Sequence, residues 1–257
     1  MPHPELARIY AFLVAFDRRR AGRTVDVPGA FAVFDEEFPA SHGDNHLVLP
    51  GPVADPERLP VLADKVLGHL SHRTVYVYDE ESGAACVDPM TRAGYEHSRD
   101  LVMLHTGPVP DGPDARRAGP VGLDDLRDPL TDSLHSFLPG VGAEVVRQLV
   151  ERRESRRRGA DTVHFVASRT AAGEVAAWAD LYLDPAGGIA QIEDLTTAEA
   201  HRRRGHADAV VATALRTAAE AGCRTRFLIA DADDWPRDWY VRRGFTVIGL
   251  WRCFQRD

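Results

Sequence analysis

The chain is poor in cysteine and has no long apolar run. Only three cysteines occur among its 257 residues, and none belongs to a CxxC pair. This count excludes a disulfide framework and the usual zinc spacing. No stretch approaches the roughly 18 apolar residues of a membrane-spanning helix. Asp17 and the arginines after it interrupt the N-terminal apolar segment, so we expect no leader peptide. We therefore expect a cytoplasmic protein with no metal and no membrane partner.

The chain also lacks an excess of positive charge. Its 31 basic and 39 acidic residues give a formal net charge of −8. Binding to nucleic acid needs a concentrated basic surface, so nucleic acid is not an expected partner. Hydrophobic residues make up 44% and charged residues 27% of the chain, which predicts a globular protein with a sizeable core.

Proline and glycine crowd together in residues 106–120, TGPVPDGPDARRAGP. This composition is typical of a loop. We place a domain boundary near residue 110, which gives an N-terminal domain of residues 1–110 and a C-terminal domain of residues 111–257.

The C-terminal domain alternates between patterns typical of helices and of strands. The pattern predicts helices at 141–157, 207–221 and 236–243, an antiparallel meander of strands at 162–168, 174–183 and 189–195, and further strands at 225–230 and 245–254. This order predicts an α+β (mixed α/β) fold.

The N-terminal domain shows a similar order of elements at a spacing of about 150 residues. After a helix at 4–20, we predict a helix at 59–70, a strand at 74–78, an acidic loop at 79–83, a short helix at 87–95 and a strand at 101–104. The parallel order favours a degenerate tandem duplication. Chance similarity is the competing explanation, because few positions are identical.

A basic, glycine-containing segment, Arg202-Arg203-Arg204-Gly205-His206-Ala207, lies between a predicted strand and a predicted helix. Small residues let a ligand approach the backbone, and the start of a helix offers unpaired N–H groups and a partial positive charge. This segment predicts a phosphate or pyrophosphate site. The alternative is a basic loop that caps a helix without binding a ligand.

Two motifs together resemble the GNAT superfamily of N-acetyltransferases. Arg202-x-x-Gly205-x-Ala207 is similar to its acetyl-CoA motif, and Tyr240-x-x-x-Gly244-Phe245 matches its C-terminal motif. The resemblance implies a GNAT-like acyl-CoA acyltransferase fold that is complete in residues 111–257 and truncated in the N-terminal half. The Asp-Trp-Pro at 234–236 resembles actinobacterial members of unassigned substrate.

The resemblance also implies roles for individual residues. The backbone before the loop would pair with the pantetheine arm, and the loop amides would cradle the pyrophosphate. The implied cofactor-binding residues are Leu195, Thr196, Thr197, Arg202, Arg203, Arg204, Gly205, His206, Ala207, Asp208 and Asp233. Tyr240 would protonate the departing thiolate, since a phenol stays protonated at neutral pH. The alternative for Tyr240 is a core aromatic side chain.

The candidate base is Glu193. Strand alternation predicts that Glu193 and Asp194 point to opposite faces, with Glu193 on the face of Leu195. A strand glutamate without catalytic role is the alternative. Asp233 stands where the family often has an asparagine, and we favour the interpretation that Asp233 caps the helix beginning near Pro236.

Three further features favour structural interpretations. The arginines at 152, 153 and 156–158 are expected on a solvated helix face or at a helix C-terminus. Trp178 is expected in the core. The histidines of the N-terminal half, which are His42, His46, His69, His72 and His97, lack metal spacing and are interpreted as structural or surface residues.

The N-terminal half is not expected to bind acetyl-CoA. Residues 47–60 contain one glycine and four prolines, which lack the N–H groups of a phosphate cradle, and Met90 stands at the tyrosine position. The resemblance thus predicts one active site per chain, for acetyl transfer from acetyl-CoA to a primary amine, favouring a small-molecule acceptor over a protein. An acyl-CoA-binding or regulatory module with little turnover is the alternative. A homodimer stays an open alternative.

Overall fold

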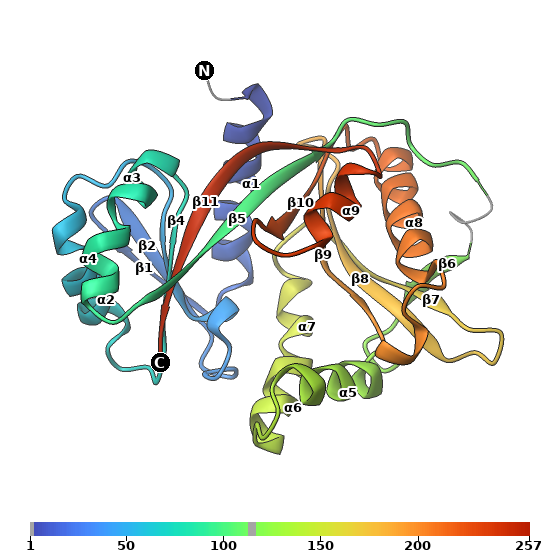
Figure 1. Ribbon diagram of the computed structural model, residues 1–257, viewed down its shortest axis with the longest axis horizontal. Coiled ribbons are helices and arrows are strands. Elements are labelled where there is room, and N and C mark those ends of the chain that lie inside the picture. The colour runs from blue at the N-terminus through green and yellow to red at the C-terminus, as the bar shows by residue number, and fades with distance from the viewer. Residues whose placement is uncertain (1–2, 113–116) are drawn as a thin grey trace. The chain divides into compact units, whose positions relative to one another are not determined.

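A computed structural model describes residues 3–112 and 117–257, and its chain divides into two compact units. The first unit contains the residues up to 103 together with 229–257, and the second contains residues 104–228. Strands β5 (Glu96–His105) and β10 (Thr225–Asp231) each have residues in both units. Each unit combines a sheet with helices, so the predicted mixed α/β class is confirmed (Figure 1).

The first unit has strands in the order β1-β2-β3-β4-β11-β5, followed by the second part of β10. Strands β1 and β2 form an antiparallel hairpin, β3 and β4 run parallel, and β11 pairs antiparallel with β4. Its helices are α1 (Pro4–Arg20), α2 (Leu59–Leu67), α3 (Glu80–Ala85), α4 (Val87–Arg92) and α9 (Pro236–Val241), with short 3-10 turns η1 (His42–Asp44) and η2 (Pro56–Arg58). Its strands are β1 (Arg23–Val27), β2 (Ala30–Phe34), β3 (His46–Leu49), β4 (Arg73–Val77), β5 (Glu96–His105) and β11 (Phe245–Arg256).

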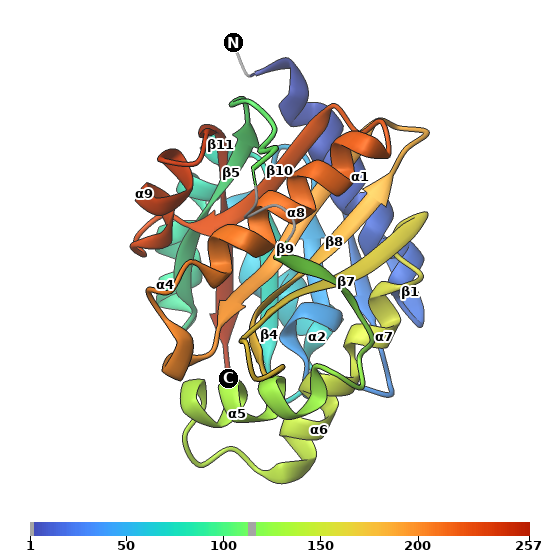
Figure 2. The same ribbon diagram turned by 90° about the vertical axis from the view of Figure 1, so that its right-hand side faces the viewer.

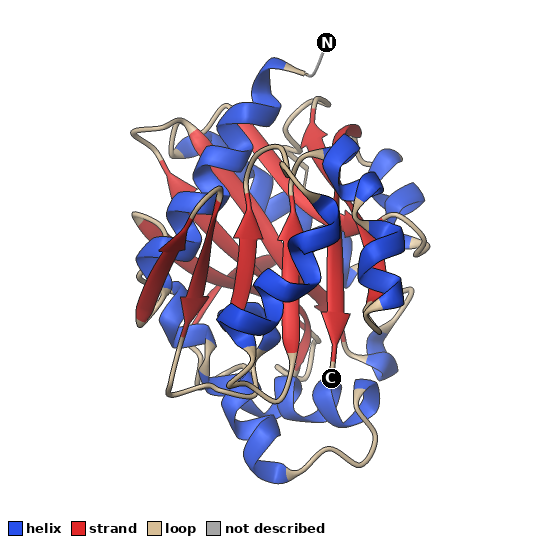
Figure 3. Cartoon of the chain, turned by 90° about the vertical axis from the view of Figure 1, so that its left-hand side faces the viewer, coloured by secondary structure: helices blue, strands red, loops and turns tan. Residues whose placement is uncertain are grey.

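Helices cover both faces of the strands in the first unit (Figures 1 and 3). Helix α1 buries Ile9, Phe12, Leu13 and Phe16, whose spacing by three or four residues places them on one face. Helices α2 and α4 contribute to a core cluster on the other face, with Leu59, Leu67 and Met90 fully or nearly fully buried. These contacts confirm the helices predicted at 4–20 and 59–70 and the strand predicted at 74–78.

One prediction in this unit is wrong. Residues 79–83 were expected to form an acidic loop, but most of them belong to helix α3. The Asp79 carboxylate accepts a hydrogen bond of 2.9 Å from the Ser82 backbone N–H and caps the helix. The acidic residues therefore lie in the first turn of a helix, where negative charge is stabilising.

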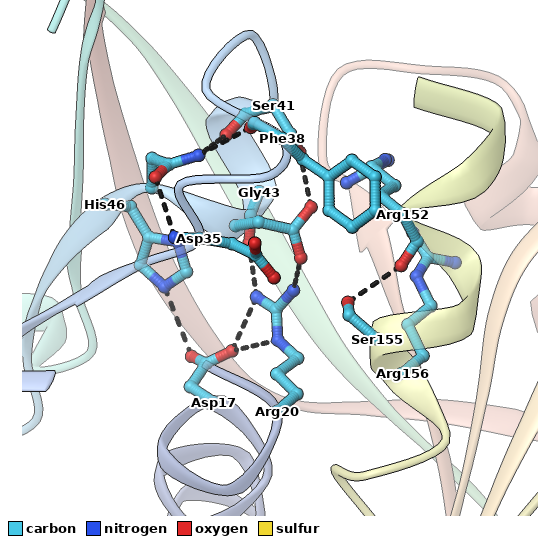
Figure 4. A network of polar contacts seen from close by, with 12 residues as sticks. Asp17, Arg20, Asp35, Phe38, Ser41, Gly43, His46, Arg152, Ser155 and Arg156 are labelled. Carbon is cyan, nitrogen blue, oxygen red and sulfur yellow. Dashed lines mark hydrogen bonds and ion pairs between the residues drawn. The ribbon is translucent and has the colours of Figure 1, made fainter. Parts of the chain in front are cut away.

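Charged side chains are buried in the first unit around Arg20, at the end of α1 (Figure 4). The Arg20 guanidinium donates to Asp17 at 2.9 Å and also to Asp44 and the Gly43 carbonyl. His46 Nε2 lies 3.3 Å from the Asp17 carboxylate. Arg20 thereby ties α1 to the segment before β3.

The second unit has strands in the order β10-β9-β8-β7-β6, beginning with the first part of β10. All neighbours are antiparallel except β9 and β10, which run parallel. Its strands are β6 (Ala118–Val121), β7 (Thr162–Arg169), β8 (Val175–Asp184) and β9 (Ile189–Thr197). Its helices are α5 (Arg127–Phe137), α6 (Ala143–Glu151), α7 (Arg153–Arg156) and α8 (His206–Glu220), with the 3-10 turn η4 (Glu199–His201). Helix α8 crosses β7, β8 and β9 and contacts all three (Figure 2).

The predicted meander, the helix at 207–221 and the strands at 225–230 and 245–254 are confirmed. The prediction of one helix over 141–157 is wrong, because α6 and α7 are separate helices that meet at Arg152. The Ser155 hydroxyl donates to the Arg152 carbonyl at 2.7 Å, a side-chain contact that bends helices (Figure 4). The predicted loop at 106–120 ends in strand β6, and its residues 113–116 lie outside the described residues.

The compact units divide the chain differently from the predicted domains. Residues 229–257, which include α9 and β11, belong to the same unit as the N-terminal 103 residues. A compact unit and a repeated family domain are different things, so the division at residue 110 and the tandem duplication stay predictions.

Candidate functional site

The glycine loop joins the end of β9 to the start of α8 through η4. Gly205 is the N-cap of α8 and has a φ of 80°, in the left-handed region that favours glycine. A Cβ at Gly205 would meet no atom within 4 Å. The backbone conformation, and not the packing, therefore requires glycine here. Open space lies beside the first turn of the helix.

Positive charge surrounds this helix start. Arg202, Arg203 and Arg204 are exposed, and the Arg202 side chain lies 3.9 Å from the Glu199 carboxylate. Arg203 also has a positive φ, of 60°. The first turn of a helix leaves its N–H groups without intrahelical acceptors and carries a partial positive charge. The loop has the properties of an anion-binding site.

His206 begins α8 with its side chain turned inward. The side chain is buried, and Nδ1 lies 2.9 Å from the Ser168 hydroxyl of β7. Burial lowers the pKa of His206, and the nearby charges of His201, Arg117 and Arg204 lower it further. A neutral ring therefore anchors the helix start to β7, and only the backbone of His206 is suited to a ligand.

The last residues of β9 have different neighbours on their two sides. Thr196 and Thr197 pair with Trp178 and Ala177 of β8. On the side of β10, pairing begins at Ile189 with Thr225 and ends at Ile192 with Leu228. The pairing of β9 with β10 thus ends before Leu195, Thr196 and Thr197. Trp178 is fully buried, which confirms the prediction that it belongs to the core.

A β-bulge interrupts β9 at Asp194. Asp180 pairs with Glu193 and Trp178 pairs with Thr196, so two residues of β9 oppose the single residue Ala179. Asp194 has a φ of 51°, which aspartate adopts more readily than most residues. The expectation that Glu193 and Asp194 point to opposite faces is wrong, because the bulge breaks the alternation. Their carboxylates belong to one cluster.

Two arginines of α7 bind this cluster. Arg156 Nη1 lies 2.7 Å from the Asp194 carboxylate, and Arg153 Nη2 lies 3.3 Å from it. Both guanidinium groups also donate to Asp180 of β8. Arg153 and Arg156 are only 5% and 6% exposed, and Asp180 is fully buried. The prediction of a solvated arginine face is therefore wrong for these two residues.

The cluster separates the pKa values of the two neighbouring carboxyl groups. Burial and the Asp194 charge raise the pKa of Glu193 to about 8, against opposing effects of Arg156 and a hydrogen bond from Gln191. Arg156 and Arg153 hold the pKa of Asp194 well below its usual value, against the opposing effect of partial desolvation. Of the two, Glu193 is the group suited to proton exchange near neutral pH.

Tyr240 lies in α9 of the first unit. It is 8% exposed, and its ring makes edge contacts with Trp239 at 5.2 Å and with Phe245 at 5.7 Å between centroids. These contacts fix the ring orientation. The catalytic and the core interpretations of Tyr240 both remain compatible with this packing.

Asp233 does not cap α9. Its carboxylate pairs with Arg99 of β5, which lowers the pKa of Asp233 and raises that of Arg99. The N-cap of α9 is Trp235, and no side chain caps it. The preferred capping interpretation is therefore wrong, because Arg99 offers the carboxylate a charged partner. Its role in cofactor binding stays a prediction.

The buried cluster of Arg153, Arg156 and Asp180 was not predicted from the sequence. One signal was present, because Asp180 interrupts the otherwise apolar run of β8. A charge in the middle of a buried strand demands a partner of opposite charge. The arginine-rich segment 152–158, which precedes this strand, supplies it through Arg153 and Arg156.

Two general observations concern the described residues, 3–112 and 117–257. No helix among them is long and apolar enough to cross a bilayer. No three of their His, Cys, Asp or Glu side chains are grouped as a metal site would need.

Two histidines of the first unit stack on each other. The ring centroids of His42 and His72 lie 3.9 Å apart, and burial lowers the pKa of His72 to about 4.

Comparisons with known proteins agree with this geometry. Residues 130–245 match the model of the acetyltransferase (GNAT) family. No curated protein sequence matches the chain.

Several solved structures share the fold. A GCN5-related N-acetyltransferase from Kribbella flavida is 19% identical, with a TM-score of 0.65 over 97% of this chain and 94% of that one. A functionally unknown conserved protein from Staphylococcus epidermidis is 11% identical, with a TM-score of 0.67 over 90% of this chain and 92% of that one. A GCN5-related N-acetyltransferase from Sphaerobacter thermophilus is 19% identical, with a TM-score of 0.55 over 89% of this chain and 76% of that one. At such identities the likeness shows the fold alone.

Proposed function

The chain carries a GNAT-family acetyltransferase domain at residues 130–245, and from this premise we propose that it transfers the acetyl group of acetyl-CoA to a primary amine. The observation that carries the proposal is the left-handed Gly205 at the start of α8, which follows, through the turn η4, a strand whose pairing with β10 ends at Ile192. The acceptor we favour is a small molecule.

The residues of the loop fit the diphosphate of acetyl-CoA. The N–H groups from Arg203 to Asp208 surround the helix start, and the arginine side chains add full positive charges. A side chain at position 205 would project into the open space that the diphosphate needs. Beyond Ile192, the edge of β9 offers the backbone of Leu195, Thr196 and Thr197 to the amide groups of pantetheine.

Two side chains divide the proton transfers between them. Glu193 accepts the proton that the amine loses as its nitrogen bonds to the acetyl carbon. Tyr240 donates its phenolic proton to the sulfur as the carbon–sulfur bond breaks. The raised pKa of Glu193 supports its role, because a base near neutral pH exchanges protons most effectively. Tyr240 is assigned by its place in the family motif.

A binding and a turnover assay test this proposal together. Calorimetry measures the dissociation constant of acetyl-CoA, and a thiol-release assay measures turnover with a panel of primary amines. Tyr240→Phe is expected to lower kcat by about 10²-fold to 10⁴-fold while leaving acetyl-CoA affinity nearly unchanged, since the phenol acts as a general acid.

Tyr95→Phe is the matched control. Tyr95 is also a buried tyrosine of the first unit, and its hydroxyl has no hydrogen-bond partner in the described structure. Its removal should change kcat less than twofold, or about 0.4 kcal/mol in barrier. Tight binding of acetyl-CoA without acetylation of any amine would instead favour an acyl-CoA-binding or regulatory module.

A further inference from the structure

The buried arginines of α7 contact the one strand of the second unit that carries the proposed base. Arg156 bridges Asp180 of β8 and Asp194 of β9, and Arg153 makes the same two contacts. Two buried guanidinium groups therefore join α7 to both strands at the bulge. We call Arg153, Arg156, Asp180 and Asp194 the arginine clamp.

The clamp holds a backbone conformation that most residues avoid. Asp194 has a positive φ, in a region that few residues other than glycine, asparagine and aspartate adopt. Such a conformation persists only where surrounding contacts determine it. Here the contacts are the ion pairs of the Asp194 carboxylate with Arg156 and Arg153. The bulge in turn sets the directions of Glu193 and of the Leu195 backbone.

We propose that Arg156, assisted by Arg153, is a positioning residue for acetyl transfer, which holds Asp194 and so fixes the bulge that presents Glu193 and the Leu195 backbone to the site. This inference rests on the proposed function, because it assigns a purpose to the geometry of the same strand. It adds residues outside both sequence motifs to the machinery of the reaction.

The ionisation of Glu193 responds to the charges of the arginine clamp, so it can be used to test the clamp. Asp194 and Asp180 disfavour the ionised form of Glu193, whereas Arg156 and the amide of Gln191 favour it. On β8, the Tyr182 hydroxyl donates to Asp180 at 3.1 Å. On the helical side, Arg152 joins Arg153 and Arg156 in acting on Asp194. Removing the charge of Asp194 and removing the charge of Arg156 should therefore shift the pKa of Glu193 in opposite directions.

Three variants separate charge from geometry. Asp194→Asn removes the charge but keeps a residue type that tolerates positive φ. Arg156→Gln removes the positive charge, and Arg156→Lys keeps it while replacing the planar guanidinium, whose Nη1 contacts both carboxylates, by a compact ammonium of different reach. Arg147→Gln is the matched control, because Arg147 lies on α6 with a side chain that is 55% exposed and pairs with the exposed Glu144.

The primary readout is a ¹³C NMR titration of the Glu193 carboxyl group, identified by its loss in Glu193→Gln. Asp194→Asn should lower the midpoint by about one pH unit or more, and Arg156→Gln should raise it by a similar amount, as expected for charges a few ångströms away. Arg147→Gln should leave it unchanged. The acidic limb of the kcat profile should move with the midpoint.

Arg156→Lys tests the geometry. The midpoint should stay close to that of the wild type, while kcat/KM falls by about tenfold to a hundredfold because the bulge is no longer held. Shifts of the Glu193 midpoint in the same direction for Asp194→Asn and Arg156→Gln would overturn the proposal. So would full activity of Arg156→Lys.

The proposed function can fail separately. If the wild-type chain acetylates no amine, or if the acidic limb survives in Glu193→Gln, the assigned reaction or base is wrong. The positioning role of the arginine clamp is then tested by the NMR midpoints and by the affinity for acetyl-CoA, which depends on the Leu195 backbone. An unchanged affinity in Arg156→Lys would then refute the positioning role.

Discussion

Replacing Asp180 with asparagine should destabilise the second unit strongly. Asp180 is fully buried, and its carboxylate accepts from two guanidinium groups that are themselves nearly buried. Asparagine has almost the same shape, so the substitution removes charge with little change in packing. Removal of one partner from a buried ion pair costs about 3–5 kcal/mol, because the remaining charge is left uncompensated.

The lower end of this range, about 3 kcal/mol, is the expected loss for Asp180→Asn, because Asp194 continues to pair with both arginines. Urea unfolding followed by tryptophan fluorescence measures the change. Trp178 lies two residues away on β8, and the other three tryptophans of the chain belong to the first unit. A fluorescence change assigned to Trp178 therefore reports on the second unit.

The control for Asp180→Asn is Asp125→Asn. Asp125 also pairs with an arginine, Arg169, at 2.6 Å, but the two side chains are 42% and 41% exposed. A solvent-exposed pair contributes about 0–1 kcal/mol. If both substitutions lower the unfolding free energy by the same small amount, the argument from burial is wrong.

Three further predictions concern other parts of the chain. Gly205→Ala should lower the unfolding free energy by about 1–2 kcal/mol because of the positive φ at this position, and it should also weaken acetyl-CoA binding. Gly173 has a φ of 90° and equally open space, so Gly173→Ala should lower the unfolding free energy but leave acetyl-CoA binding unchanged. Urea unfolding measures the stability, and calorimetry measures the binding. Glu193 has a higher pKa in the folded chain than its ordinary 4.5, so the unfolding free energy should fall as pH rises from about 4.5 to about 8. Glu193→Gln should flatten that part of the stability profile, and an unchanged slope would contradict the assignment. Residues 111–257 expressed alone should fail to give a cooperative unfolding transition, because β11 then lacks β4; a sharp transition would show that this strand pair is dispensable.

Local signals in the sequence were sufficient for the elements that lead into and out of the loop. The alanine-rich pattern of 207–221, the alternation of the meander and the stop at Gly222 each depend on neighbouring residues. The structure confirms those elements, and Gly222 has the positive φ expected after a helix. The family motifs likewise consist of short segments.

The features that the sequence analysis missed depend on distant partners. In the sequence, Arg153 and Arg156 belong to a charged segment typical of a solvated helix face. Only the fold brings Asp180, more than twenty positions later, into contact with them. Asp233 resembles a helix cap until Arg99 offers an ion pair across 134 positions. The bulge at Asp194 similarly shows only when β9 is aligned with β8. Pairing across the fold, and not local propensity, decides each of these positions.

The place of β11 has a consequence for how the chain is made. Its residues complete the sheet between β4 and β5, yet they follow β5 in the chain only after the whole of the second unit (Figure 1). At about 5–20 residues per second, the roughly 150 residues after β5 take about 8–30 s to synthesise. During that time the facing edges of β4 and β5 lack their permanent neighbour, and exposed strand edges promote aggregation. The second unit is thus synthesised while the sheet of the first unit is still incomplete, and that sheet closes only when β11 has been made.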